Sequence, residues 1–335
     1  MARLAALAAA AMLTALPAAL PARADWDKAK LDAGIGAIEK ASQGRLGVAL
    51  IDLADRTRWS HRGGEPFPMQ SVFKLPLAFT VLQAVEAGKL KLDQPVTVTR
   101  ADLSLYHSPI ADGFRGERQD FPLRDLVRRA TGDSDNTAAD LLMRLAGGPQ
   151  AVTRMLRDGG IEGISIDRYE RVFQPEILGL PGYGPQEAID RKAFRARVLA
   201  VPEAERRQRL AASLNDRRDA ATPEASVAFL EAMAKGTWLR EPAHAALVER
   251  IATETKSGPK RLKAGLPAGA RLIHKTGLGP SAAGLNHATN DIGIVVLPNG
   301  RRFAVAVYLA GSTASPEARE AAHAAVARLA VASLR

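Results

Sequence analysis

Strand-like runs stand at both ends of this chain, and a long helical stretch separates them. Near the N-terminus, Leu46–Leu53 predicts one strand and Arg56–Ser60 a second. Three further runs follow near the C-terminus, namely Arg271–His274, Asp291–Leu297 and Phe303–Leu309, and the last two flank Pro298-Asn299-Gly300, which is typical of a hairpin turn. Because strands need neighbours in a sheet, we expect the two ends to build one sheet together, with the helical stretch inserted between its halves.

Apolar residues recur at helical spacing between Ser71 and about Lys235, and several of these runs stop at Gly, as helix ends prefer. Further helices are expected at Asp25–Ser42 and from about Pro316 to Leu334. We therefore predict an α/β (α+β) fold with an antiparallel sheet of about five strands, flanked by the terminal helices. The α/β part comprises residues 25–68 and about 260–335, and the inserted all-α part comprises about 69–259.

Residues 1–24 have the layout of a secretory signal peptide. Arg3 supplies a positive start, Leu4–Leu20 is uncharged, and Ala22-Arg23-Ala24 fits a cleavage site before Asp25. The alternative is a membrane anchor, but alanine is only weakly apolar and Pro17 would disturb a spanning helix. We expect a periplasmic or secreted protein that is free of the membrane after cleavage.

Charge and cysteine content narrow the possible partners. The net charge is +10, and +8 after removal of Arg3 and Arg23, which leaves anionic partners open. Aromatic residues make up only 5% and no recognition module accompanies the charge, so nucleic acid is not expected. The chain has no cysteine, and its six histidines show no ligand spacing, so we predict neither a metal nor another cofactor. A monomer is expected.

The first candidate for chemistry is Ser71-Val72-Phe73-Lys74, at the start of a predicted helix. A serine and a lysine three residues apart share one helix face, so the amine can reach the hydroxyl. Lysine can serve as the base for a serine nucleophile once its pKa is lowered. The helix N-terminus also directs backbone N–H groups towards developing negative charge. By itself the pattern arises by chance in most chains of this length.

Two triplets make chance a poor explanation. Ser134-Asp135-Asn136 falls between two helical runs, and Lys275-Thr276-Gly277 closes a strand-like run. Either triplet alone fits a plain turn or a strand end, but each is expected only roughly 0.05 times in a chain of this size. Together with Ser71, and in this order, they form the signature of serine β-lactamases and penicillin-binding proteins.

The chain resembles the class A β-lactamases over nearly all of residues 25–335. The nucleophile segment Phe67–Lys74 and the segment Asp167-Arg168-Tyr169-Glu170, at the family's Ω loop, both match. Further matches are His274–Gly277, Thr289-Asn290-Asp291, and Arg218-Asp219 followed by Thr222-Pro223. The resemblance implies a serine β-lactamase/penicillin-binding-protein-like fold. It also implies that the protein hydrolyses the β-lactam amide of penicillins and cephalosporins, which are small-molecule substrates, without a cofactor.

The resemblance also implies catalytic roles. Ser71 would attack the lactam carbonyl, with its own N–H and that of Leu278 as the oxyanion hole. Lys74 would take the serine proton, either directly or through Glu170 and a water. Ser134 would pass a proton to the departing lactam nitrogen. Glu170 would then activate the water that hydrolyses the acyl-enzyme.

The substrate-binding residues that the resemblance implies are Tyr106, Asn136, Gln174, Lys275, Thr276, Gly277, Leu278 and Arg319. Asn136 would hold the side-chain amide of the substrate and help to orient Lys74. Lys275 and Thr276 would bind the carboxylate that penicillins and cephalosporins share. Tyr106 would be an aromatic residue at the rim of the site, and Arg319 would supply a second carboxylate contact.

Three features depart from the family pattern. Gln174 stands where asparagine is usual, and Leu278 stands where a small or hydroxyl residue is common. The Ω loop is also much longer than usual, because it contains an insertion at about 181–218. We expect a solvated helix pair there, with a functional lid as the alternative, and we expect Arg168 and Asp219 to pair across the base of the loop.

Two other functions remain open. A D,D-peptidase of cell-wall metabolism shares the three serine and lysine motifs, but Glu170 argues against it because slow deacylation needs no such base. A catalytically quiet penicillin- or peptidoglycan-binding protein is the second alternative, with the long loop occluding the pocket.

Overall fold

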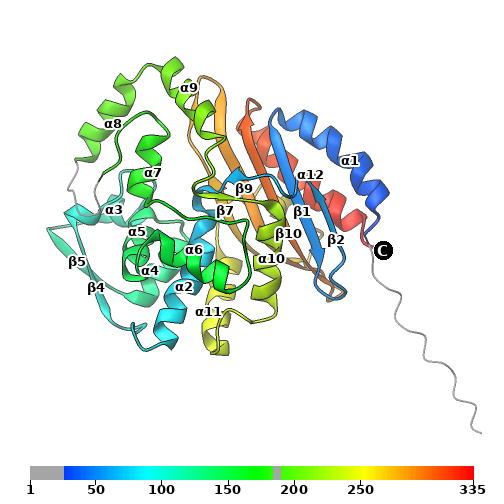
Figure 1. The fold of residues 1–335 in the computed structure, drawn as a ribbon, viewed down its shortest axis with the longest axis horizontal. Helices are drawn as coiled ribbons and strands as arrows, with labels where there is room; N and C mark the ends of the chain where they lie inside the picture. Colours follow the sequence, from blue (N-terminus) through cyan, green and yellow to red (C-terminus); the bar gives the residue numbers. More distant parts are fainter. Residues whose placement is uncertain (1–25, 184–189) are drawn as a thin grey trace, which may run out of the picture.

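The central sheet takes its strands from both ends of the chain, which confirms the predicted fold (Figure 1). The computed structural model describes residues 26–183 and 190–335, so the expected signal peptide lies outside the described residues. The sheet order is β2-β1-β10-β9-β7, with β8 paired to β9, and every pairing is antiparallel. Its strands are β1 (Arg45–Asp52), β2 (Arg58–His61), β7 (Arg271–Leu278), β8 (Ser281–Ala282), β9 (Leu285–Val296) and β10 (Arg302–Ser312).

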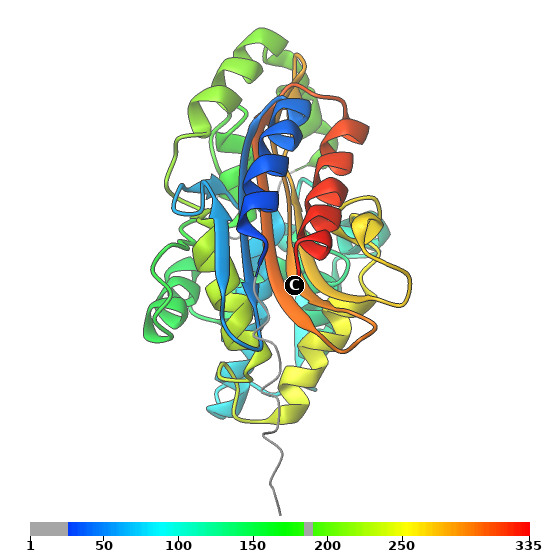
Figure 2. The ribbon, with the colours of Figure 1, turned by 90° about the vertical axis from the view of Figure 1, so that its right-hand side faces the viewer.

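Both faces of this sheet are covered. Helices α1 (Lys28–Ser42) and α12 (Pro316–Ala332) lie on one face, as Figure 2 shows, and pack with Trp26 and Phe303 in one apolar cluster. The helical part covers the opposite face. Double coverage explains why β9 and β10 are buried almost throughout instead of alternating between buried and exposed residues. Strand β9 begins at Leu285, before the apolar run that predicts it from Asp291, because the largely polar segment from Asn286 to Asn290 also pairs with β10.

The helical part surrounds α2, most of whose side chains are buried. Its α-helices are α2 (Lys74–Glu86), α3 (Pro109–Gly113), α4 (Leu123–Thr131), α5 (Asn136–Leu145), α6 (Pro149–Asp158), α7 (Glu170–Glu176), α10 (Pro223–Ala234) and α11 (Pro242–Glu254). Short 3₁₀ turns occur at η1 (Gln70–Phe73), η2 (Arg100–Asp102) and η3 (Leu262–Gly265). Two small antiparallel pairs complete the framework: β3 (Phe67–Pro68) with β6 (Ala220–Ala221), and β4 (Pro95–Thr99) with β5 (Arg118–Pro122).

The insertion in the long loop forms two helices, α8 (Arg191–Ala200) and α9 (Glu203–Ser213), which arch over the top of the molecule in Figure 1. Their outer faces are charged and exposed, as a solvated pair requires, but each helix also buries an apolar residue, Phe194 or Leu210. The arch is therefore attached to the body of the protein and is more than a free excursion into solvent.

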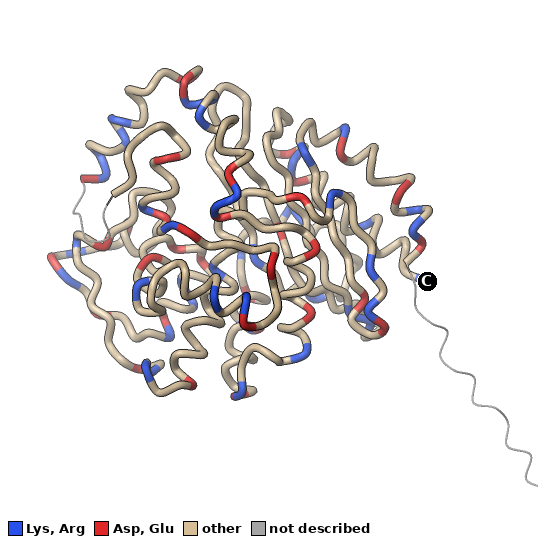
Figure 3. Tube along the Cα trace, in the orientation of Figure 1, with Lys and Arg blue, Asp and Glu red and all other residues tan. Residues whose placement is uncertain are grey.

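Basic and acidic residues are interspersed along the trace in Figure 3. Basic residues predominate on α8, which carries Arg191, Lys192, Arg195 and Arg197. Within residues 26–183 and 190–335, no helix combines the length and apolarity that crossing a membrane requires.

Candidate active site

The segment around Ser71 turns sharply into α2. Gln70 has a φ of 49°, in the left-handed region that residues other than glycine rarely adopt, and this conformation starts the 3₁₀ turn that carries Ser71. From β9, the Asn290 amide donates to the carbonyls of Pro68 (2.8 Å) and Met69 (3.0 Å) and so holds the segment against the sheet. The nucleophile candidate is thus placed at the junction between the sheet and the helical part.

Lys74 is fully buried and points at Ser71. Its Nζ lies 3.0 Å from Ser71 Oγ, donates to the Ser134 carbonyl at 2.8 Å, and also contacts Asn136 Oδ1. Burial lowers the pKa of Lys74, although the nearby negative charge of Glu170 opposes this shift. A lysine with a lowered pKa, in hydrogen-bond contact with a hydroxyl, has the properties of a general base.

The Ser134-Asp135-Asn136 loop is rigidly held. Ser134 has a φ of 59°, a strained conformation for a serine. Asp135 is buried, caps α5 through the Ala138 N–H (3.0 Å), and accepts the Ile110 N–H at 2.7 Å. Asp135 therefore supports the loop, while Ser134 Oγ faces two lysines, at 3.1 Å from Lys275 Nζ and 3.4 Å from Lys74 Nζ.

Strand β7 brings Lys275 to the same place. Lys275 is fully buried, and its pKa lies well below the usual lysine value because of burial and of the positive charge on Lys74. Thr276 is held by a hydrogen bond from its Oγ1 to Ser257 Oγ (2.9 Å). Gly277 permits the close approach of the nucleophile segment, because a Cβ there would lie 2.5 Å from the Met69 carbonyl oxygen.

Glu170 enters the cluster at the first residue of α7. Asp140 fixes this helix start by accepting the N–H groups of Glu170 (2.8 Å) and Arg171 (3.1 Å). Burial and the neighbouring Glu170 raise the pKa of Asp140 to about 7. The Glu170 side chain is 2% exposed, and its Oε2 accepts from Gln174 Nε2 (2.8 Å) and Asn136 Nδ2 (3.4 Å). Within the described part of the chain, Glu170 Oε1 has no hydrogen-bond partner and lies 4.0 Å from Lys74 Nζ.

The structure places Arg168 and Asp219 together at the base of the long loop, as the sequence predicts. Arg168 Nε donates to Asp219 Oδ2 at 2.6 Å. The contact is not the two-bond fork expected between arginine and a carboxylate, because Asp219 Oδ1 instead accepts the backbone N–H groups of Asp167 (2.8 Å) and Arg168 (3.1 Å). Asp219 thereby fixes both the side chain and the backbone just before Glu170.

Arg319 lies on α12, and its expected contact with a substrate carboxylate stays a prediction. Arg319 donates to the Ala314 carbonyl (2.8 Å), and no hydrogen bond in the described residues joins it to Lys275 or Thr276. Arg261 contacts both β7 and β9, donating to the carbonyls of Gly277 (3.2 Å) and Asn290 (2.9 Å). Arg261 lies in no recognisable motif. Its contact with the sheet becomes evident only from the packing of η3 in the structure.

The structure places Tyr106, the expected rim residue, against the insertion. Its ring packs edge-to-face on Phe194 of α8, with the ring centres 5.5 Å apart, and its carbonyl accepts from Arg191 (3.4 Å). Burial raises the pKa of the Tyr106 hydroxyl. The insertion therefore covers Tyr106, a contact that local sequence patterns do not predict.

The neighbouring His107 is exposed, and no motif in the sequence indicates a role for it. Its carbonyl accepts the Asn136 N–H (3.0 Å), and its ring lies 2.9 Å from the Asp133 carbonyl, next to Ser134. His107 and Ser257 both line a groove of about 570 Å³, large enough for a small-molecule substituent. Since Ser257 contacts Thr276, this groove adjoins the cluster. Leu278, 57% exposed, lies at the end of β7.

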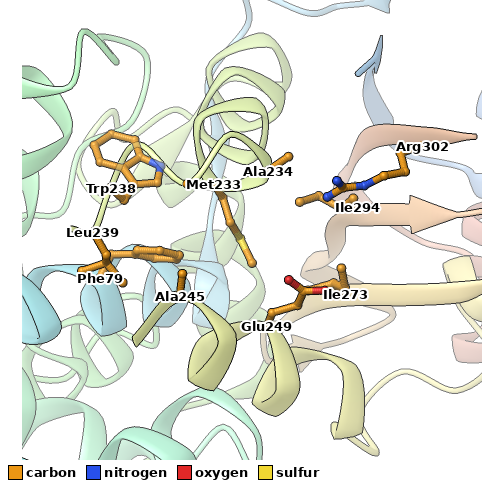
Figure 4. Close-up of a pocket in the computed structure, with 11 residues that line it drawn as sticks. Phe79, Met233, Ala234, Trp238, Leu239, Ala245, Glu249, Ile273, Ile294 and Arg302 are labelled. Atoms are coloured by element: carbon orange, nitrogen blue, oxygen red, sulfur yellow. The ribbon is translucent and has the colours of Figure 1, made fainter. Parts of the chain in front are cut away.

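A second cavity is lined by none of the residues of this cluster. It occupies about 40 Å³ between α2, α10, α11 and the sheet, and Figure 4 shows Phe79, Met233 and Trp238 among its lining residues. Pockets for drug-sized ligands usually exceed about 300 Å³, so this cavity is too small to be the site. The described residues contain no cluster of side chains suited to a metal ion.

The cluster unites a candidate hydroxyl nucleophile, two buried amines and a buried carboxylate. Ser71, Lys74, Ser134, Asn136, Glu170, Gln174, Lys275 and Thr276 all belong to it. Such a set supports acyl transfer, because it can deprotonate a nucleophile, protonate a leaving group and activate water without a cofactor.

Comparisons with known proteins agree with this geometry. The model of the β-lactamase enzyme family matches residues 30–334. The chain is 35% identical over 267 residues to the extended-spectrum β-lactamase PER-1 of Pseudomonas aeruginosa, covering 79% of this chain and 75% of that protein. It is 34% identical over 295 residues to β-lactamase L2 of Stenotrophomonas maltophilia, covering 88% and 82%.

Solved structures show the same relationship. The class A β-lactamase of the last common ancestor of Gram-negative bacteria has a TM-score of 0.73 and 36% identity, with 90% of this chain and 98% of that chain covered. A β-lactamase from Chitinophaga pinensis has a TM-score of 0.73 and 30% identity, with 90% and 97% covered. Motifs, sequence and fold therefore agree, and the chain belongs to class A of the β-lactamase family.

Proposed function

We propose that this protein hydrolyses the β-lactam amide bond of penicillins and cephalosporins through an acyl-enzyme on Ser71. The observation that carries the proposal is the single buried cluster in which Lys74 Nζ contacts Ser71 Oγ at 3.0 Å and lies 4.0 Å from Glu170 Oε1. The contact between Lys74 and Ser71 serves acylation, and Glu170, on the other side of Lys74, serves the hydrolysis of the ester.

In acylation, Ser71 Oγ attacks the lactam carbonyl carbon while Lys74 takes its proton, directly or through Glu170 and a water. The lowered pKa of Lys74 favours direct transfer. The N–H groups of Ser71 and Leu278 stabilise the oxyanion. As the C–N bond breaks, Ser134 passes a proton to the nitrogen and is reprotonated by Lys74, whose Nζ lies 3.4 Å from Ser134 Oγ and holds the proton taken from Ser71.

Substrate is held at both ends of the cluster. Lys275 and Thr276 bind the carboxylate of the lactam, and the Arg261 guanidinium adds positive charge behind the same strand. Asn136 holds the amide of the acyl side chain. The groove beside Ser257 receives the substituent on the carboxylate side.

In deacylation, Glu170 takes a proton from the water that attacks the ester carbonyl, and this proton is relayed through Lys74, whose Nζ lies 4.0 Å from Glu170 Oε1, to Ser71 Oγ as it leaves. Glu170 Oε2 is occupied by amide donors, so Oε1 is the oxygen that receives the proton. This step distinguishes the proposed function from that of a D,D-peptidase, whose acyl-enzyme persists because water is not activated.

A time-resolved adduct measurement tests the proposal. The protein is mixed with a penicillin, quenched in acid after successive intervals, and digested before mass spectrometry. The peptide that contains Ser71 should gain the mass of the intact drug and then lose it as the ring-opened acid accumulates. Penicillin hydrolysis with no adduct on Ser71 at any interval contradicts the proposed route.

Asp219→Asn is expected to slow deacylation by about 10-fold or more and acylation less, since hydrogen bonds to charged groups each contribute roughly 1.5–3 kcal/mol. Asp219 holds Arg168 and two backbone N–H groups just before Glu170, and asparagine offers them one acceptor instead of two. Single-turnover kinetics separates the two steps. Asp216→Asn is the matched control, because Asp216 meets Arg168 only at 3.3 Å and at a more exposed position. Equal slowing of both steps by Asp219→Asn would refute the assignment.

Replacing residues 181–218 by a short linker is expected to leave the turnover of small penicillins within a few-fold. In the described residues, no hydrogen bond joins α8 or α9 to Ser71, Lys74 or Glu170, and loop shortening costs little entropy. The preference among bulky cephalosporins should change, because the arch contacts Tyr106 and the β8–β9 turn. A folded, trimmed variant that has lost nearly all penicillin turnover would instead establish the insertion as a lid.

We also propose that the protein is exported and acts as a periplasmic or secreted monomer. The uncharged Leu4–Leu20 segment and the Ala22-Arg23-Ala24 sequence support removal of a signal peptide. N-terminal sequencing of the protein released by its native host should find Asp25 first. A retained Met1 would favour the membrane anchor.

A further inference from the structure

Four buried side chains form an unbroken hydrogen-bonded chain from the carboxylate of Glu170 to the central sheet. Gln174 Nε2 lies 2.8 Å from Glu170 Oε2 and 3.0 Å from Gln70 Oε1. Gln70 Nε2 in turn lies 2.8 Å from His287 Nδ1. None of the four side chains is more than 7% exposed. The chain therefore connects α7, the turn before Ser71, and β9.

Glu170 sets the direction of every hydrogen bond in this chain. A carboxylate only accepts, so the Gln174 amide nitrogen must donate to Glu170, and it donates its second N–H to Gln70 Oε1. The Gln70 amide is thereby oriented with its nitrogen towards β9, where it must find an acceptor. His287 Nδ1 meets this need only if its ring is neutral and carries its proton on Nε2. Burial, with the positive charge of Arg168, lowers the pKa of His287 to about 4 and keeps the ring neutral.

The backbone leaves room for this chain at one glycine. A Cβ on Gly279 would lie 3.0 Å from Gln70 Nε2 and 3.0 Å from His287 Cβ, a separation tighter than ordinary contact. The backbone also joins these two segments, since Gly279 N donates to the Ala288 carbonyl at 2.8 Å and His287 N donates to the Pro280 carbonyl at 2.9 Å. The link between Gln70 and His287 thus depends on the absence of a side chain at residue 279.

We infer that His287 is a positioning residue for deacylation, because it supplies the acceptor that fixes Gln70, and through Gln70 and Gln174 the carboxylate of Glu170. Without that acceptor, the amide nitrogen of Gln70 has no partner on β9. Rotation of the Gln70 amide then turns this nitrogen towards the N–H of Gln174. Gln174 would lose one of its two partners, and Glu170 Oε2 would lose a fixed donor. Oε1, the oxygen that meets the water, would then be less well oriented. This inference rests on the proposed function.

Two substitutions at residue 287 test the inference, because they differ in whether an acceptor remains. His287→Leu removes the acceptor and keeps an apolar side chain of moderate size. His287→Asn places its Oδ1 close to the position of Nδ1 and can still accept from Gln70. Acylation and deacylation of a penicillin are measured separately for both variants and the parent, and the melting temperature of each is recorded.

His287→Leu is expected to slow deacylation by about 10-fold, the effect of losing one buried hydrogen bond, and to change acylation much less. His287→Asn should recover most of that loss. Gly279→Ala, which leaves His287 in place but crowds the Gln70 contact, should also slow deacylation selectively. It keeps the inference testable if His287→Leu does not fold.

The inference is overturned if His287→Leu and His287→Asn deacylate equally fast, or if the folded variants slow both steps by the same factor. Loss of the proposed function itself has a different signature, since the parent protein would then never form the adduct on Ser71.

Discussion

Glu170→Gln is expected to trap penicillin as a covalent adduct on Ser71. Glutamine cannot take a proton from water, and general-base catalysis commonly contributes about 10²–10⁴-fold. Acylation should continue, because Lys74 contacts Ser71 Oγ directly and has a lowered pKa. Mass spectrometry of the intact variant should therefore show a stable gain equal to the mass of the drug, while drug hydrolysis falls by the same factor as deacylation.

Glu170→Ala serves as the companion variant. It also removes the base but cannot keep the hydrogen bond to Gln174, so a shared phenotype assigns the effect to the lost carboxylate and not to the new amide. If either variant hydrolyses penicillin at the parental rate, Glu170 is not the deacylating base. The interpretation of the loop that begins at Arg168 would then be wrong.

Ser71→Ala is expected to abolish both the adduct and the turnover. Removal of a serine nucleophile costs about 10⁶-fold in a serine protease, which sets the scale of the expected loss. Within the described residues, Ser134 is the other hydroxyl in contact with Lys74, at 3.4 Å, and it lies on the leaving-group side of the site. The measurements are mass spectrometry after incubation with penicillin and the rate of ring opening.

Ser257→Ala is the matched control for Ser71→Ala. Ser257 belongs to the same cleft and contacts Thr276 at 2.9 Å, so its loss should weaken substrate binding without preventing the adduct. An adduct on Ser71→Ala protein, at Ser134 or elsewhere, would contradict the assignment of the nucleophile.

Local patterns predicted the elements that carry the chemistry. The sheet built from both chain ends follows from apolar runs, because a doubly covered sheet requires them. Ser71, Lys74, Ser134 and Lys275 come together because their motifs lie at helix starts and strand ends, where short segments dictate position. Arg168 and Asp219 were paired from sequence despite the long insertion between them, since opposite charges at a loop base form a recognisable pattern.

Contacts between distant segments were not predictable in this way. Tyr106 lies under α8 because Phe194 packs on it, and nothing near either residue in the sequence indicates that contact. Arg261 approaches β7 because of how η3 packs against the sheet. The link from Gln174 through Gln70 to His287 joins three separate elements. Gln174 was recognised as unusual, but its second partner depends on tertiary structure.

The most direct measurement is the time course of a chromogenic cephalosporin with the purified protein that starts at Asp25, at several molar equivalents of substrate. The account predicts continued turnover, with every equivalent hydrolysed and a rate proportional to enzyme concentration, because Glu170 releases the acyl-enzyme. A burst of one equivalent followed by no further change would indicate a peptidase-like protein that acylates without deacylating. No change in absorbance would indicate a binding protein, and either result would contradict the account.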